Sequence, residues 1–157
     1  MQWADVLSDK SLRDLPYKIE LDKWGNVIMS PASNRHGRLQ GMLFTVLDKL
    51  PDGRALIECS VATSEGIKVA DVAWSSDSFF DRYGYETPYP RAPEICVEVR
   101  SPSNSEEELS FKTRLYLEAG AKEVWIVLET GEARFFGSEG EQAHSKYSVD
   151  PRPLLNH

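Results

Sequence analysis

The sequence predicts an α/β (α+β) fold in which helices cover a central β-sheet. Two segments, Ser33–Leu50 and Ser103–Ala119, carry apolar residues three and four positions apart, which is typical of amphipathic helices. Between them, shorter segments show the patterns of β-strands. A further segment, Glu123–Leu128, is apolar on both faces, so we expect a central strand that is covered on both sides.

The N-terminal part of the chain is expected to form a short helix and a hairpin. Trp3–Leu15 fits the helix, which Pro16 would end. Tyr17–Asp22 alternates between apolar and charged residues and therefore indicates a strand. The pair Gly25-Asn26 favours a turn, and Val27–Met29 begins the second strand.

The first long helix, Ser33–Leu50, has one apolar stripe. The residues of this stripe lie three or four positions apart: Leu39, Leu43, Val46, Leu47 and Leu50. Gly37 and Gly41 weaken the helix by about 1 kcal/mol each relative to alanine. Because these glycines lie on one face, we expect another backbone segment to approach the helix there.

The rest of the chain adds further elements. Three more strands are predicted at Arg54–Thr63, Ile67–Ser75 and Glu94–Arg100. A helical turn is expected at Ser76–Tyr83, and Ala133–Phe136 is expected to pair in a hairpin. The second long helix can begin with a capping box, formed by Ser103 with Glu106 or by Ser105 with Glu108. The tail after Gly137 is weakly patterned.

Length and charge limit the class of protein. The 157 residues contain one predicted core and no linker, so we expect a single domain, 1–157. The chain has 18 Lys and Arg residues against 25 Asp and Glu residues, a formal net charge of −7. This balance excludes a generally basic nucleic-acid binder. It does not exclude a nucleic-acid enzyme, because a bound divalent cation would supply positive charge.

Nothing in the sequence indicates export or a membrane. The N-terminal segment has no continuous apolar run, so neither a signal peptide nor a membrane span is expected. Cys59 and Cys96 lie in apolar strands without a near partner, which favours buried thiols over a disulfide. We therefore expect a cytoplasmic protein.

Two acidic residues stand alone inside apolar strands. Asp71 lies within Val69–Trp74, and Glu98 lies within Ile95–Arg100. Burying an unpaired carboxylate is costly, and two carboxylates in neighbouring strands repel each other unless a cation lies between them. Either each acid lies at a strand end or pairs with an arginine, or the two hold a hard cation such as Mg²⁺.

Lys112 lies on the inward side of the second long helix, three residues after Leu109 and four before Tyr116. A lysine at the edge of such a stripe usually extends its ammonium group to solvent. This helix directly follows the strand of Glu98 and packs on the sheet, so Lys112 is alternatively placed to reach the two acids.

Four residues earlier in the chain are weaker candidates. Glu20 lies on the polar side of the first hairpin strand and is either a solvent-exposed acid or a further acid of the site. His36 is on the apolar stripe, where a core or capping histidine is the usual interpretation. Arg35 and Arg38 form a local basic patch, either as solvated helix surface or as a contact for substrate.

The order and spacing of these residues resemble the Uma2 family of bacterial restriction endonucleases, within the PD-(D/E)XK nuclease superfamily. The resemblance runs from about Leu12 to Phe136. It rests on these segments: Tyr17–Leu21, Met29–Pro31, the helix with His36, Val69–Val72, Val97–Ser103, Lys112, Tyr116, Ala119-Gly120 and Glu123–Trp125.

The resemblance implies a restriction-endonuclease-like fold, with a central mixed β-sheet flanked by α-helices. It implies that Asp71 and Glu98 bind the metal, Mg²⁺ or Mn²⁺, and that Lys112 is the catalytic lysine. It also adds Glu20, the acid of the N-terminal hairpin, and the main-chain carbonyl of Val99 to the metal ligands.

Arg100 departs from the family pattern, which usually has an aliphatic residue there. Since Arg100 follows Glu98 by two positions, both side chains should point to the same face of the strand. Arg100 either assists Lys112 or forms a salt bridge that inactivates Glu98. An arginine stays protonated and cannot act as a base.

These features lead to the hypothesis of a metal-dependent endonuclease that hydrolyses DNA, with Arg35, His36 and Arg38 towards the substrate. The resemblance also implies a homodimer. The alternatives are a catalytically inactive binding module with the same fold, and a metal-dependent hydrolase of another substrate. The aromatic stretch Phe79–Tyr89 fits base stacking, a dimer interface or ordinary loop packing.

Overall fold

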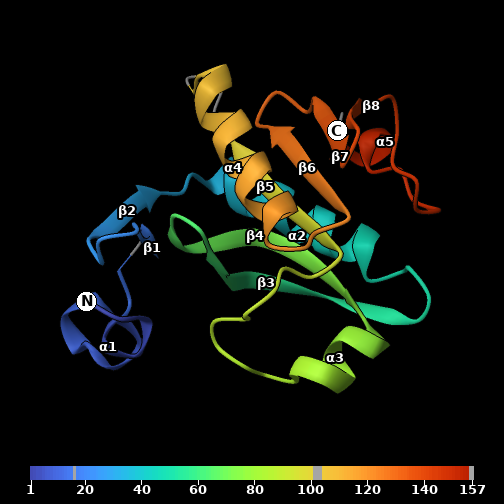
Figure 1. The fold of residues 1–157 in the computed structure, drawn as a ribbon. Helices are drawn as coiled ribbons and strands as arrows, with labels where there is room; N and C mark the ends of the chain where they lie inside the picture. The colour runs from blue at the N-terminus through green and yellow to red at the C-terminus, as the bar shows by residue number, and fades with distance from the viewer. Residues whose placement is uncertain (16, 101–103, 156–157) are drawn as a thin grey trace.

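A six-stranded mixed β-sheet forms the centre of the computed structural model, which describes residues 1–15, 17–100 and 104–155. Its strands lie in sequence order: β3 (Gly53–Thr63), β4 (Gly66–Ser76), β5 (Ile95–Arg100), β6 (Glu123–Leu128), β7 (Ala133–Gly137) and β8 (Gly140–Gln142). Strands β5 and β6 are parallel, and the other neighbours are antiparallel (Figure 1). The predicted mixed sheet is confirmed.

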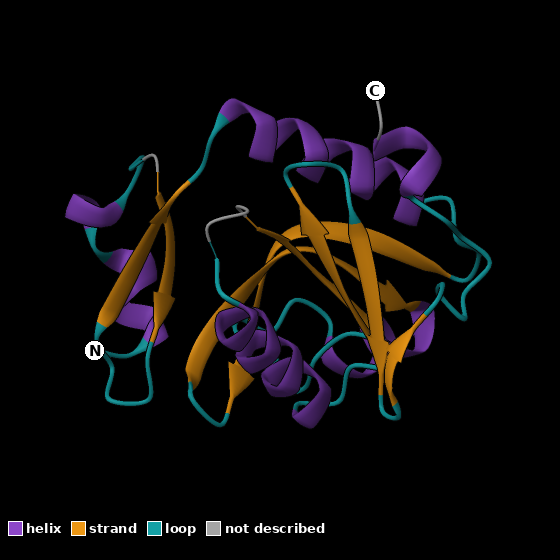
Figure 2. Ribbon diagram, turned by 90° about the horizontal axis from the view of Figure 1, so that it is seen from above, coloured by secondary structure: helices purple, strands orange, loops and turns teal. Residues whose placement is uncertain are grey.

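Two long helices cover the sheet, α2 (Asn34–Leu47) on one face and α4 (Glu106–Glu118) on the other (Figure 2). The apolar stripe of α2 packs on β4, β5 and β6 in one buried cluster, as the spacing predicts. The side chains of Leu109 and Tyr116 from α4 pack on the opposite face in a second cluster. Strand β6 is buried on both faces because it contributes to both clusters.

The caps of the two helices follow local sequence. Ser33 precedes α2 and accepts a hydrogen bond from the main-chain N–H of His36 at 3.0 Å. Ser105 precedes α4 and accepts from the N–H of Glu108 at 3.1 Å. Each cap satisfies one of the N–H groups that a helix start leaves without an intrahelical partner. The alternative cap at Ser103 lies outside the described residues.

The N-terminal hairpin is a separate two-stranded sheet, made of β1 (Tyr17–Leu21) and β2 (Val27–Pro31). It stands beside the main sheet together with α1 (Trp3–Ser8) (Figure 1). The predicted helix Trp3–Leu15 is too long. Asp9 ends α1 in an extended conformation, and its side chain then caps a 3₁₀ helix, Lys10–Leu12. Pro16 lies outside the described residues.

The C-terminal tail is more ordered than its sequence pattern suggests. It adds β8 and a short helix, α5 (Arg152–Leu155), at the far edge of the sheet. The buried carboxylate of Glu123 holds this tail, because it accepts hydrogen bonds from Ser145 Oγ at 2.6 Å and from the N–H of Lys146 at 2.7 Å. Trp125 Nε1 donates to the same carboxylate at 2.9 Å. This attachment joins residues that are about 22 positions apart in the sequence. The periodicity of a single segment cannot predict such contacts.

Helix α3 (Asp77–Tyr83) confirms the predicted helical turn. Both cysteines are buried free thiols, and burial raises the pKa of Cys59 to about 12. No described helix has the length and apolar character needed to cross a membrane.

The expected close approach at Gly37 and Gly41 is wrong. A methyl group added at either position would meet no atom within 4 Å outside the helix's own backbone. Both glycines lie on the exposed side of α2.

Replacing Gly41 by alanine is therefore expected to raise the free energy of unfolding by about 0.5–1 kcal/mol, because alanine has the higher helix propensity and meets no neighbour. Urea denaturation of wild type and Gly41→Ala measures the change. A lower midpoint for the variant would contradict the open surface at this position.

Candidate active site

Asp71 and Glu98 lie where β4 and β5 separate. These strands pair only at Val72↔Val97, Ala73↔Cys96 and Trp74↔Ile95. Each acid comes one residue beyond the last pair, Val72↔Val97. The Asp71 carboxylate takes the place of the missing main-chain partner, since its Oδ2 accepts from the N–H of Val99 at 2.8 Å. The divergence of the two strands thus turns both acids towards one point.

A lysine occupies that point. Lys18 Nζ lies 3.2 Å from Asp71 Oδ1 and 2.9 Å from Glu98 Oε2. We call this location between the two carboxylates the bridging position. Lys18 was not predicted from the sequence, although one signal was present: it precedes Glu20 by two residues on β1 and therefore shares its face.

Lys112 does reach the acids, as the second interpretation of its helix position predicts. Its Nζ lies 3.0 Å from Glu98 Oε1 and 2.6 Å from Glu20 Oε2. Glu20 Oε2 also accepts from the main-chain N–H of Val69 at 2.6 Å, which ties the hairpin to β4. The side chains of Lys112 and Glu20 are only 9% and 7% exposed, so neither is the solvated surface residue of the alternative interpretation.

Tyr116 completes the surroundings of Glu98. Its hydroxyl donates to Glu98 Oε1 at 2.7 Å, and both side chains are fully buried. The sequence pattern places Tyr116 on the inward side of its helix and predicts no polar contact for it. Its position four residues after Lys112 on the same helix face was the signal for a polar role.

Helix α2 contacts the other side of Asp71. His36 Nε2 lies 3.3 Å from Asp71 Oδ2. Gln40 Nε2 donates to the main-chain carbonyl of Asp71 at 2.8 Å and to Glu58 Oε1 at 2.9 Å. Glu58 has a φ of +54°, in the left-handed region that favours glycine. It lies opposite Asp71, at a position where the pairing of β3 with β4 is interrupted between Ile57↔Val72 and Cys59↔Ala70. Gln40 therefore supplies the hydrogen bond that this interruption leaves open.

Among the described residues, none of the three predicted arginines forms an ion pair with Asp71 or Glu98, whose ion-pair partners include Lys18 and Lys112. Arg35 and Arg38 are exposed on α2 and do not line the cleft described below. Arg100 lies on the same face of β5 as Glu98, as its spacing predicts. Its Nη2 is 3.9 Å from Glu108 Oε2, and the described residues show no ion pair between Arg100 and Glu98. The side chain reaches past the buried acid to the start of α4.

The charges of this cluster stabilise one another. Burial by itself raises the pKa of Glu98. The ammonium groups of Lys112 and Lys18 have the opposite and larger combined effect, so the pKa of Glu98 is lowered and its carboxylate stays ionised. Burial opposes the charge of Lys18 in the same way, yet Glu98 and Asp71 raise the pKa of Lys18 above its usual range. The contact with Asp71 raises the pKa of His36 against the effect of burial.

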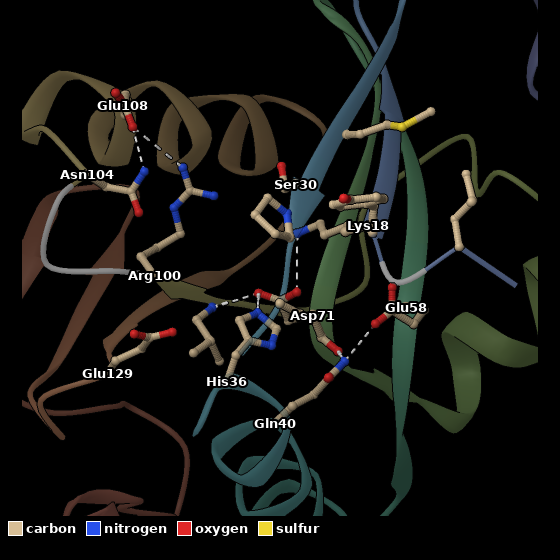
Figure 3. A pocket seen from close by; sticks show the side chains of 16 residues that line it. Lys18, Ser30, His36, Gln40, Glu58, Asp71, Arg100, Asn104, Glu108 and Glu129 are labelled. Carbon is tan, nitrogen blue, oxygen red and sulfur yellow. Dashed lines mark hydrogen bonds and ion pairs between the residues drawn. The ribbon is translucent and has the colours of Figure 1, made fainter. Parts of the chain in front are cut away.

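A cleft of about 770 Å³ opens onto Asp71 between the hairpin, α2 and the start of α4 (Figure 3). Both positively and negatively charged side chains line this cleft. The labelled polar residues around it are Lys18, Ser30, His36, Gln40, Glu58, Asp71, Arg100, Asn104, Glu108 and Glu129. Figure 3 shows Lys18 and His36 approaching Asp71 from opposite sides, with Arg100 directed towards Glu108.

The donor set at the bridging position fits a hard divalent cation. Within the described residues, no three His, Cys, Asp or Glu side chains converge as metal ligands do. Mg²⁺ needs fewer, because it binds through one or two carboxylates and completes its shell with water and substrate phosphate. Asp71 and Glu98 each direct one oxygen at a single positively charged atom, Lys18 Nζ, which marks where a cation is favoured.

One solved structure has a similar fold. This chain is similar to the crystal structure of a protein from Anabaena variabilis described as "a putative nuclease belonging to DUF820", with a TM-score of 0.64 and 17% sequence identity. The match covers 79% of this chain and 74% of that one. At this identity the similarity shows that the two proteins share a fold.

The family model of Uma2, described as "Putative restriction endonuclease", matches residues 10–154. The chain belongs to the Uma2 family. No curated protein has a significant sequence match to it.

Proposed function

We propose that this protein is a metal-dependent endonuclease that hydrolyses phosphodiester bonds of DNA. One observation supports the proposal most directly. In a member of a restriction endonuclease family, two carboxylates from diverging strands converge on one cationic atom beside an open cleft.

Asp71 and Glu98 would hold Mg²⁺ or Mn²⁺. The main-chain carbonyl of Val99 is a further candidate ligand, because the N–H of the same residue already faces Asp71 and the two groups of one strand residue point to the same side. When bound, the cation polarises a phosphoryl oxygen and lowers the pKa of a bound water.

The remaining residues hold these groups and offset charge. Lys112, fixed by Glu20 and Glu98, would orient the attacking water and stabilise the negative charge that develops on the phosphate. His36 would keep Asp71 in place from the side of α2. Arg100, which lines the cleft and is partly exposed, would contact a substrate phosphate, for which a guanidinium group is well suited.

Helix α2 is proposed to contact the DNA through two arginines. Arg35 and Arg38 are exposed on the helix that carries His36, so they are available to phosphates of a bound duplex outside the cleft. One cause considered for the binding-module alternative was a salt bridge between Arg100 and Glu98. The ion pair of Arg100 with Glu108 favours the endonuclease instead.

Nicking of supercoiled plasmid tests the proposal. Wild-type protein is expected to nick DNA in Mg²⁺ or Mn²⁺ and to lose this activity in excess EDTA, because a phosphate approaching acidic groups needs the cation. Asp71→Asn should be inactive in both buffers. Nicking that persists in EDTA, or in Asp71→Asn, would exclude the proposed chemistry, and cleavage of RNA alone would exclude DNA as substrate.

We further propose that two copies associate to cut two strands. Strand β3 is an edge strand, and the loop at Tyr89 pairs only with its second half, at Ser60 and Ala62. Large apolar side chains are exposed at the open half: Ile57 lies on β3 itself, and Phe80 and Tyr85 line a hollow together with Arg54–Leu56 of that strand. Open edges and exposed apolar groups favour association with another chain.

Sedimentation equilibrium is expected to give a dimer mass for wild type and a monomer mass for Tyr85→Glu, which places a charge in the apolar area. A monomer in wild type, with or without DNA, would contradict the dimer. The plasmid assay stays informative in either case, since one copy suffices for a nick.

A further inference from the structure

The bridging position is filled by a side chain of the protein itself. Lys18 is the one residue of the described chain whose ammonium group contacts both Asp71 and Glu98, at 3.2 and 2.9 Å. Lys112 contacts Glu98 but its ion pairs do not include Asp71. The Lys18 side chain is 10% exposed, so its charge is largely removed from water and is balanced by these two acids.

An ammonium group and a divalent cation cannot share these two oxygens. A metal ion bound at about 2.0–2.1 Å from carboxylate oxygens would use the same lone pairs that Lys18 Nζ uses now. Two positive charges so close also repel strongly where water is excluded. Binding of one therefore requires the other to leave.

Two open spaces lie next to the Lys18 side chain. The residue lines the main cleft and also a neighbouring hollow of about 340 Å³ between the N-terminal helices and the sheet. Its four-carbon stem rotates freely, so the ammonium group can move into either space while β1 stays paired with β2.

We propose that Lys18 is an internal competitor of the divalent cation. In the metal-free protein it holds Asp71 and Glu98 together against their mutual repulsion. Cation binding displaces its ammonium group, and the strength of the Lys18 contacts sets the cation concentration at which the site fills. Lys18 can have this role only if a cation binds there, so the role depends on the proposed function.

Isothermal titration calorimetry with Mn²⁺ tests the competition without any measurement of cleavage. Lys18→Met keeps most of the stem and removes the charge, and it should bind Mn²⁺ at least about tenfold more tightly than wild type, the usual range of a coupling free energy. Lys68→Met is the matched control. Lys68 is also buried and donates to the Leu21 carbonyl at 3.4 Å, but it contacts neither acid.

The outcomes separate the two levels of the proposal. Equal affinity in wild type and Lys18→Met, with no binding by Asp71→Asn, would overturn the competition and leave the metal site standing. A gain in Lys68→Met as large as in Lys18→Met would also overturn it, because the effect would then be general electrostatics. Absence of Mn²⁺ binding in all four proteins would overturn the metal site as well.

A measurement on wild type alone covers the case that Lys18→Met fails to fold. In ¹⁵N spectra of lysine ammonium groups, Lys18 should give a protected signal in EDTA, because its Nζ donates to two carboxylates. Saturating Mg²⁺ should shift this signal to the position of solvent-exposed lysines. A Lys18 signal that stays unchanged while the site fills with Mg²⁺ would overturn the proposal.

Discussion

Glu98→Gln is expected to reduce plasmid nicking by about a thousandfold or more, since even partners outside the metal's own ligands commonly contribute 10–100-fold. One carboxylate oxygen of Glu98 faces the bridging position, and the other is fixed by Lys112 and Tyr116. Glutamine has nearly the same shape but carries no charge. It also places an amide N–H₂ group where only acceptors fit.

Glu107→Gln is the matched control for this loss. This substitution makes the same chemical change on the exposed surface of α4, at a residue that does not line the cleft. It should keep wild-type activity. Circular dichroism should show that both variants are folded at the assay temperature. Nicking by folded Glu98→Gln within tenfold of wild type would remove Glu98 from the site.

Lys112→Met is expected to lower the free energy of unfolding of the metal-free protein by about 3–5 kcal/mol, the usual cost of removing one partner from a buried ion pair. The change leaves Glu20 and Glu98 buried with less compensating charge. Methionine fills a similar volume, so the loss of stability comes mainly from the missing charge and not from poorer packing. Urea denaturation in EDTA measures it.

A second variant shows whether the unpaired charge causes this loss. Adding Glu20→Gln to Lys112→Met removes one of the two acids that Lys112 balances, and the double variant should recover part of the stability. A loss below about 1 kcal/mol in the single variant would place the pair in the range of exposed salt bridges. The burial of Lys112 and Glu20 would then be contradicted.

Much of the site followed from local sequence because burial and charge conflict within single strands. Asp71 and Glu98 are lone acids in apolar strands, and Lys112 is a lone cation on an apolar helix stripe. Such conflicts need compensation, so the residues that resolve them are expected close together. The structure brings these three side chains together around Lys18 and Glu20.

Lys18 and Gln40 were not predicted, and for a physical reason. Lys18 reaches Glu98 across 80 positions of sequence, and Gln40 reaches the Asp71 carbonyl across 31. Such contacts depend on where the hairpin and α2 lie against the sheet, which periodicity within one element does not report. The same limit explains the tail, whose order depends on the distant Glu123.

Element ends were predictable where a capping residue marks them, as Ser105 does for α4. The end of α1 was not, because Asp9 fits both a helix continuation and the cap that it forms. The expected backbone approach at Gly37 and Gly41 failed for a related reason. A pair of small residues permits a close contact but does not require one.

The attachment of the hairpin links local folding to ligand binding. An isolated two-stranded hairpin is at best marginally stable in water. Part of the attachment of β1 to the main sheet passes through Lys18 and Glu20, which form ion pairs with the candidate catalytic residues Asp71, Glu98 and Lys112. The hairpin and the carboxylate pair therefore form one cooperative unit. Any event at the acids changes the free energy of local opening of the N-terminal strands, so their amide exchange rates are a remote reporter of the state of the site.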